Sequence, residues 1–252
     1  MIGKSKSGRV ALVTGASRGL GAEMARALAR SGWAVAVNYA HDTESATGVV
    51  ESIRGAGGSA APARFDVTDA DAVPDGIEAI RRALGPVDLI VNNATGPQPV
   101  LAIGEQTWEH YLGQLEFFLK APLTLLKAVL PDWQDRKSGR IINIGSEVVD
   151  IGTARFAHYV AAKAAMVGLT RSWATELGPV GITVNLVAPG WTPVERHANS
   201  SAESLENHRK HVLLGRMGVP GDIASVVVFV ASPAADYITG QTIAVNGGRT
   251  LA

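Results

Sequence analysis

Short apolar runs alternate along this chain with longer segments rich in alanine and leucine. The runs predict seven strands, near residues 9–13, 33–38, 61–66, 87–92, 139–145, 181–187 and 242–245. Because helices are expected between the strands, the strands would run parallel, with helices covering both faces of the sheet. The pattern therefore predicts an α/β fold with a doubly wound, seven-stranded parallel sheet.

The sequence indicates one domain that spans residues 1–252, since no linker, repeat or low-complexity stretch divides it. A chain of 252 residues can bury a full core. The least regular stretch runs from Trp191 to Asn207 and is rich in Ser, Asn and Glu. A short helix is expected after it, from Glu206 to Leu214.

Charge and composition narrow the classes of partner. The 23 Lys and Arg residues balance the 23 Asp and Glu residues, so nothing indicates a nucleic acid or an anionic membrane. The lack of cysteine excludes disulfides, thiolate catalysis and cysteine-based zinc sites, and favours the cytoplasm. The N-terminus has no apolar core of a signal peptide, and the apolar stretch from Val226 to Ala231 is too short to span a bilayer.

A glycine-rich turn follows the first strand. Residues 9–21 read Arg-Val-Ala-Leu-Val-Thr-Gly-Ala-Ser-Arg-Gly-Leu-Gly, and an alanine-rich helix is expected from Ala22 to Arg30. Gly15, Gly19 and Gly21 would permit a tight turn and let the backbone approach a pyrophosphate, whose charge the helix N-terminus stabilises. Strand, turn and helix in this order predict a Rossmann-type dinucleotide site.

Tyr159 and Lys163 stand four residues apart in a segment that we expect to be helical from Phe156 onward. That spacing places the phenol and the ammonium on one helix face. A nearby cation lowers the pKa of a tyrosine, so Tyr159 could exchange a proton with a carbonyl or alcohol oxygen. Ser146, at the end of the strand near 139–145, would hydrogen-bond the same oxygen.

The chain resembles the short-chain dehydrogenase/reductase family over its whole length, in the branch of 3-oxoacyl thioester and general carbonyl reductases. The matching segments, in the family's order, are Thr14–Gly21, Asp66-Val67, Asn92-Asn93-Ala94, Ser146, Tyr159 with Lys163, Pro189-Gly190 and Val245–Gly248.

This resemblance implies roles for individual residues. Ser146, Tyr159 and Lys163 would be catalytic, and Lys163 would also bind the ribose of the nicotinamide nucleotide. Asp66 would hold the adenine amino group, and residues 191–215 would form a lid over the substrate. The full set of cofactor-binding residues would be Gly15, Ser17, Arg18, Gly19, Leu20, Gly21, Asn38, Tyr39, Asp66, Val67, Asn92, Asn93, Ala94, Tyr159, Lys163, Pro189, Gly190 and Thr192.

The choice between NADP and NAD depends on the end of the second strand. Members of the family that use NAD present an acid there, but this chain reads Val37-Asn38-Tyr39-Ala40. Arg18 is similar to the basic residue that NADP-dependent members direct at the 2′-phosphate, although it could also be a solvated turn residue. Asp42 is better explained as a helix cap. We therefore predict NADPH as the cofactor.

Two positions depart from the family pattern. Thr95 replaces a glycine, with Gly96 directly after it. Phe118 occupies the place of the asparagine that in the family anchors a water linking the lysine to solvent. Three explanations stay open: the amide of Gln114, one turn earlier, holds that water and is catalytic; the backbone carbonyl at 118 holds it; or turnover is impaired.

The predicted function is reduction of a ketone by hydride transfer from NADPH, with a 3-oxoacyl thioester as the leading substrate. The alternatives are a dehydrogenase of a secondary alcohol, sugar or steroid, and a nucleotide-binding protein without turnover.

By resemblance we expect a homotetramer formed through the helix from Leu112 to Val129 and the C-terminal strand. The six histidines are expected at the surface or in the lid, with His158 structural, and no metal site is predicted.

Overall fold

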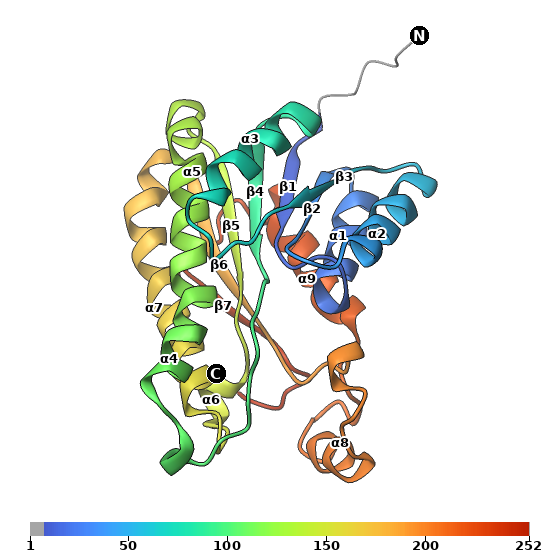
Figure 1. Ribbon diagram of the computed structural model, residues 1–252, viewed down its shortest axis with the longest axis vertical. Helices are drawn as coiled ribbons and strands as arrows, with labels where there is room; N and C mark the ends of the chain where they lie inside the picture. The colour runs from blue at the N-terminus through green and yellow to red at the C-terminus, as the bar shows by residue number, and fades with distance from the viewer. Residues whose placement is uncertain (1–7, 252) are drawn as a thin grey trace.

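Seven parallel strands form one sheet in the order β3-β2-β1-β4-β5-β6-β7 (Figure 1). The computed structural model describes residues 8–251. The strands are β1 Val10–Val13, β2 Ala34–Tyr39, β3 Ser59–Arg64, β4 Val87–Asn92, β5 Gly139–Ile144, β6 Ile182–Pro189 and β7 Thr242–Val245. The predicted fold is confirmed, although β3 begins and ends two residues before the predicted 61–66.

Helices connect successive strands, as the alternating pattern predicts. They are α1 Gly19–Arg30, α2 Thr43–Gly55, α3 Ala72–Leu84, α4 Trp108–Leu115, α5 Ala121–Arg136, α6 Val148–Ile151, α7 Ala157–Leu177, α8 Ala202–Arg209 and α9 Pro220–Ala231. A π-helical turn, η2 Glu116–Lys120, joins α4 to α5, so the helix expected from Leu112 to Val129 is present, longer at both ends and widened in the middle.

The sheet separates two apolar layers. Side chains of one strand alternate between the faces: Ala11 and Val13 pack with α1, α2 and α9, whereas Val10 and Leu12 pack with α3, α5 and α7. The α1 and α9 helices lie against each other on their face, as Figure 1 shows. Because both faces are covered, the inner strands carry continuous apolar runs rather than alternating ones.

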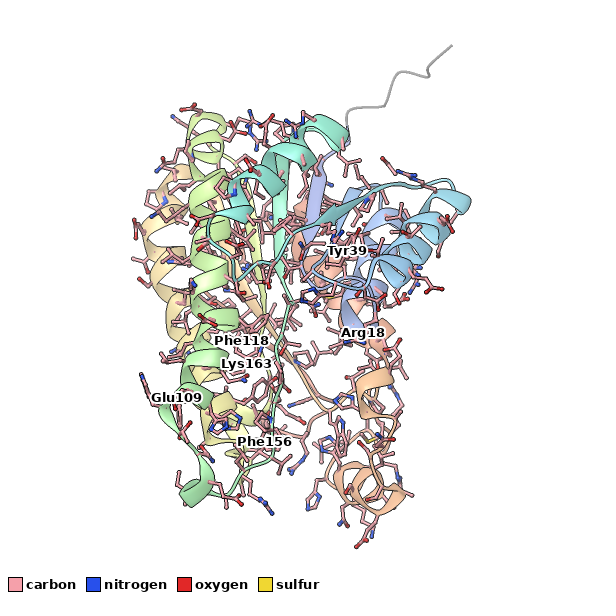
Figure 2. All side chains as sticks on the ribbon, viewed as in Figure 1. Arg18, Tyr39, Glu109, Phe118, Phe156 and Lys163 are labelled. Carbon is pink, nitrogen blue, oxygen red and sulfur yellow. The ribbon has the colours of Figure 1, made fainter. Side chains whose placement is uncertain are left out.

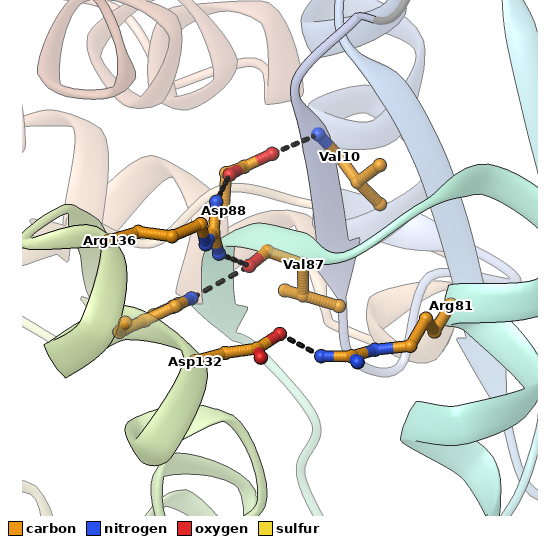
Figure 3. A network of polar contacts seen from close by, with 7 residues as sticks. Val10, Arg81, Val87, Asp88, Asp132 and Arg136 are labelled. Atoms are coloured by element: carbon orange, nitrogen blue, oxygen red, sulfur yellow. Dashed lines mark hydrogen bonds and ion pairs between the residues drawn. The ribbon is translucent and has the colours of Figure 1, made fainter.

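Charged side chains tie the two central strands to the helices where these strands begin (Figure 3). The carboxylate of Asp88 in β4 accepts a hydrogen bond from the backbone N–H of Val10 at 2.8 Å and pairs with Arg136 of α5. Arg81 of α3 pairs with Asp132 of α5. This network lies at the amino ends of the strands. It therefore holds the helices against the sheet and leaves the carboxyl ends of the strands unoccupied by these side chains.

The irregular stretch after β6 differs from its prediction in one respect. The predicted bounds of the helix from Glu206 to Leu214 are wrong, because α8 begins at Ala202. Ser201 caps this helix: its hydroxyl accepts a hydrogen bond from the N–H of Ser204 at 3.1 Å. Figure 1 shows α8 beside the far end of the sheet, away from the start of β1. Within residues 8–251, none of the helices has the length and apolar character needed to cross a membrane.

Candidate active site

The carboxyl ends of β1 and β4 meet where the strand order reverses. Thr14 follows β1, and Asn93 and Ala94 follow β4. The hydroxyl of Thr14 accepts hydrogen bonds from the N–H groups of Asn93 and Ala94, each at 2.9 Å, and donates to the carbonyl of Val91 at 3.2 Å. Ligands of open α/β sheets bind at such a crevice. We did not predict this bridging role of Thr14, although its position directly after a strand was a usable signal.

The glycine turn requires residues without side chains. Gly15 and Gly19 have φ values of 59° and 58°, in the left-handed region that favours glycine. A Cβ at Gly21 would lie 2.4 Å from the carbonyl oxygen of Gly15 and 2.6 Å from Nδ2 of Asn93. The turn therefore packs backbone on backbone at the start of α1, and a helix N-terminus is the kind of site that suits a pyrophosphate.

Asn38 fastens this turn to the sheet. Its side chain is buried, its Oδ1 accepts from the N–H of Gly15 at 3.2 Å, and its Nδ2 donates to the carbonyls of Ala63 and Phe65 at 3.1 and 3.0 Å. The side-chain amide of Asn38 therefore forms its hydrogen bonds within the protein, beside the predicted cofactor site. Tyr39, the next residue, is also buried, at 7% exposure.

A cavity of about 540 Å³ opens beside the turn, between α1 and α2. Its lining includes Ser17, Arg18, Arg26, Asp42 and Ser45. As predicted, Asp42 caps α2: its Oδ1 accepts from the N–H of Ser45 at 3.0 Å, and this bond holds the pKa of Asp42 below its usual value. The two arginines line the cavity together with the carboxylates of Asp42 and Glu195, and a guanidinium is the kind of group there that suits a phosphate.

The adenine end of the predicted site lies after β3. Oδ1 of Asp66 accepts from both the N–H and the hydroxyl of Thr68, each at 2.8 Å, so the carboxylate is fixed by a local turn. Val67 beside it is buried, at 5% exposure. Both predicted residues therefore have defined positions at the same edge of the sheet.

The predicted catalytic residues come from β5 and α7. The helix begins at Ala157, so Tyr159 and Lys163 stand one turn apart in its first part, and they are 8% and 5% exposed. Nζ of Lys163 donates to the carbonyl of Ile144, the last residue of β5, at 2.6 Å. Ser146 follows two residues later, and its Oγ accepts from the N–H of Val148 at 3.3 Å. The ammonium is thus held at the strand end that carries Ser146.

Phe118 lies directly against this lysine. Nζ of Lys163 is 3.6 Å from the centroid of the Phe118 ring, and the same ring meets that of Tyr159 edge to face at 5.6 Å. Figure 2 shows Phe118 and Lys163 together in the half of the molecule formed by α4, α5 and α7, with Arg18 in the other half. Gln114 is buried at 4% exposure, and its Nε2 donates to the carbonyl of Pro97 at 2.7 Å.

Glu147 connects the Ser146 loop to the irregular stretch and was not predicted. It is 3% exposed, and its Oε1 accepts from the N–H of Trp191 at 3.0 Å and lies 3.5 Å from Nε2 of His208 in α8. Burial raises the pKa of Glu147 and lowers the pKa of His208. An acid in an apolar context directly after Ser146 was the signal available in the sequence.

The end of β6 supplies the last group of predicted cofactor residues. The N–H of Gly190 donates to the carbonyl of Val245 in β7 at 2.9 Å, which closes the edge of the sheet beside Pro189. Thr192 is buried, and its hydroxyl donates to the carbonyl of Gly190 at 3.1 Å. These residues reach the same carboxyl edge as Ser146.

Two other observations concern the histidines. His158, next to Tyr159, is fully buried among the rings of His110, Tyr111 and Phe156, and burial lowers its pKa. Among the residues described, 8–251, there is no group of three or more His, Asp or Glu side chains that could hold a metal ion.

The switch-point crevice, the glycine turn and the Tyr159–Lys163 pair define a dinucleotide-dependent enzyme of the doubly wound α/β class. Comparison with known proteins agrees with this class. Residues 15–250 match the family model described as enoyl-(acyl carrier protein) reductase.

Similar proteins cover almost the whole chain. It is 42% identical over 248 residues to the 3-oxoacyl-(acyl-carrier-protein) reductase FabG of Staphylococcus aureus, which covers 98% of this chain and 100% of that protein. It is 39% identical over 246 residues to the protein of the same name from Vibrio cholerae, covering 97% and 98%. A dehydrogenase/reductase from Sinorhizobium meliloti superposes with a TM-score of 0.88, at 35% identity, over 97% of this chain and 96% of that chain.

The chain belongs to the short-chain dehydrogenase/reductase family. It is an oxidoreductase that acts on carbonyl and alcohol groups and uses a nicotinamide cofactor.

Proposed function

We propose that this enzyme reduces 3-oxoacyl thioesters to 3-hydroxyacyl thioesters with NADPH. The observation that carries the proposal is the position of Lys163, whose ammonium is bonded to the Ile144 carbonyl at 2.6 Å and stands one helical turn from Tyr159. The two named reductases of similar sequence act on this substrate class, which supports the choice. No observation favours the alternative of a sugar or steroid dehydrogenase.

When bound, the nicotinamide supplies a hydride to the carbonyl carbon. Tyr159 donates its hydroxyl proton to the carbonyl oxygen, which becomes the alcohol, and Ser146 hydrogen-bonds that oxygen and orients it. Lys163 holds the ribose and stabilises the phenolate that remains on Tyr159.

The cavity between α1 and α2 supports NADPH over NADH. Arg18 and Arg26 line it, but Arg26 is engaged with Ser52 and Glu23, and the side chain of Asp42 is engaged in capping α2, so Arg18 is the cation we assign to the phosphate. An acid committed to a cap is not directed at ribose hydroxyls, whereas a guanidinium matches a 2′-phosphate.

We also propose a homotetramer in the cytoplasm. Exposed apolar side chains on the α4–α5 face support the assembly, since Trp108, Leu112 and Leu123 are 62%, 43% and 47% exposed. Light scattering of the purified protein measures the assembly directly, and a monomer in dilute solution would contradict it.

Oxidation of NADPH and NADH, followed at the nicotinamide absorbance, tests the activity. With the reduced nucleotides the substrate panel holds a 3-oxoacyl thioester and the matching enoyl thioester. With NADP+ and NAD+, whose reduction is followed at the same absorbance, it holds a secondary alcohol and a sugar. We expect NADPH-selective turnover of the 3-oxoacyl thioester, and a loss of about 10² to 10⁴-fold in kcat in Tyr159→Phe, which still binds NADPH. Turnover of the enoyl thioester alone would overturn the proposed substrate.

A further inference from the structure

The ring of Phe118 occupies the space over the Lys163 ammonium. Phe118 is 1% exposed, and Nζ of Lys163 lies 3.6 Å from its ring centroid, a distance of direct contact with the ring face. The aromatic ring of Tyr159 is farther from the same nitrogen, at 5.6 Å. Of these two rings, the one closer to the ammonium therefore belongs to a side chain without a polar atom.

A buried ammonium needs compensation for the water it has lost. Nζ of Lys163, a residue that is only 5% exposed, has the Ile144 carbonyl at 2.6 Å. The negative face of an aromatic ring attracts a cation in the same way, and the attraction is stronger where water is excluded. The carbonyl and the Phe118 ring thus both stabilise the charged form of this side chain.

The local backbone explains how a phenylalanine reaches this position. Phe118 is the middle residue of the π-helical turn η2, which packs against α7. Such turns are rare and occur frequently at functional sites. Phe118 belongs to a buried apolar cluster with Ala162 and Met166 of α7 and Leu186 of β6, so the ring lies within the packed core.

We propose that Phe118 is a positioning residue that holds the Lys163 ammonium through a cation–π interaction. In this chain the ring acts on the charge itself, where the family places an asparagine and a water. The inference rests on the proposed function only in giving Lys163 its role toward the nucleotide and Tyr159. The contact itself stands without it.

The test replaces Phe118 with phenylalanines that carry one, two or three fluorines. Each fluorine weakens the negative ring face while leaving the shape of the side chain nearly unchanged. We expect the midpoint of urea unfolding to fall stepwise with the number of fluorines. In a Lys163→Met background, which lacks the ammonium, the same series should show no trend. Phe118→Leu gives the limit of a side chain without a π face.

Phe117 provides the matched control. It is the neighbouring residue of η2, partly buried, and its ring packs near Gly96. The same fluorinated series at 117 should leave the unfolding midpoint without a stepwise trend. A flat series at 118, or equal trends at 117 and 118, would overturn the proposal.

Nucleotide binding and turnover provide the functional readouts. From phenylalanine to trifluorophenylalanine at 118, we expect the affinity for NADPH to fall by about tenfold, in steps, and kcat/KM to follow. If no thioester or ketone is turned over but the unfolding trend persists, the proposed function fails and the role of Phe118 stands. If the thioester is turned over normally but the unfolding midpoint does not change along the fluorinated series, the role of Phe118 fails and the proposed function stands.

Discussion

Oε1 of Glu147 lies 3.5 Å from Nε2 of His208, so the residue directly after Ser146 meets a helix that is separated from it by some sixty positions in the chain. The same carboxylate oxygen accepts from the N–H of Trp191 at 3.0 Å. The ring of Trp191 in turn contacts that of His208 edge to face at 5.4 Å. These contacts join the predicted lid, residues 191–215, to the Ser146 loop.

The burial of His208 predicts how stability depends on pH. Burial lowers the pKa of His208 in the folded state, and the charges of Arg249 and His211 lower it further. Below the ordinary value of 6.5 the unfolded chain binds a proton that the folded protein resists, so stability is lost as the pH falls through the interval below 6.5. We expect His208→Gln to lose less stability than the wild type between pH 7 and pH 5. Urea unfolding at both pH values measures it, and equal losses would contradict the prediction.

The pH dependence of stability that Glu147 contributes has the opposite sign to that of His208. Burial raises its pKa above 4.5, although the hydrogen bond from the N–H of Trp191 and the charge of Arg249 oppose the rise. Above 4.5 the unfolded carboxyl ionises while the folded one keeps its proton, so the wild type loses stability as the pH rises toward the folded pKa. The unfolding free energy of the wild type minus that of Glu147→Gln should therefore decrease with rising pH. A difference that is constant or increases from 4.5 upward would contradict it.

Arg18 is predicted to select NADPH. It lines the cavity between α1 and α2. Loss of a charge-assisted hydrogen bond to the 2′-phosphate should raise the KM for NADPH by about 10 to 100-fold in Arg18→Ala, and leave that for NADH unchanged. Arg26→Ala is the control, because the Nε of Arg26 donates to Ser52 at 3.3 Å and its guanidinium is 3.9 Å from Glu23. Equal losses with the two nucleotides would contradict the assignment.

The glycine turn should tolerate no side chain at Gly21. A methyl group there would lie 2.4 Å from the carbonyl oxygen of Gly15, and we expect Gly21→Ala to cost about 1–3 kcal/mol of unfolding free energy. The control is Gly48→Ala within α2, where a Cβ has nothing within 4 Å and should stabilise the helix by about 0.5–1 kcal/mol. Thermal unfolding without nucleotide measures both. A neutral Gly21→Ala would show that the turn can open.

Several parts of the fold and the site could be predicted because their signals are local. A run of apolar residues reports burial on both faces of a sheet, and the strands at 87–92 and 242–245 have the predicted bounds. The four-residue spacing of Tyr159 and Lys163 is a property of a single helix, and α7 confirms it. Asp42 before a helical segment is likewise a local cap.

Other parts required the packed structure. The roles of Thr14 and Glu147 were missed, since their partners are remote in sequence: the hydroxyl of Thr14 meets Asn93, and Glu147 meets His208. The bounds of α8 were wrong because propensity is weak in a polar segment, where a serine cap sets the start.

The strand–helix alternation, the glycine turn and the spacing of Tyr159 and Lys163 are encoded locally, because each depends on backbone periodicity within one segment. The contacts of the Lys163 ammonium with the Ile144 carbonyl and the face of Phe118 depend on the packing of the fold. Those contacts join a strand end, a π-helical turn and a helix. Their distances follow from how whole elements pack, which no local pattern of residues specifies.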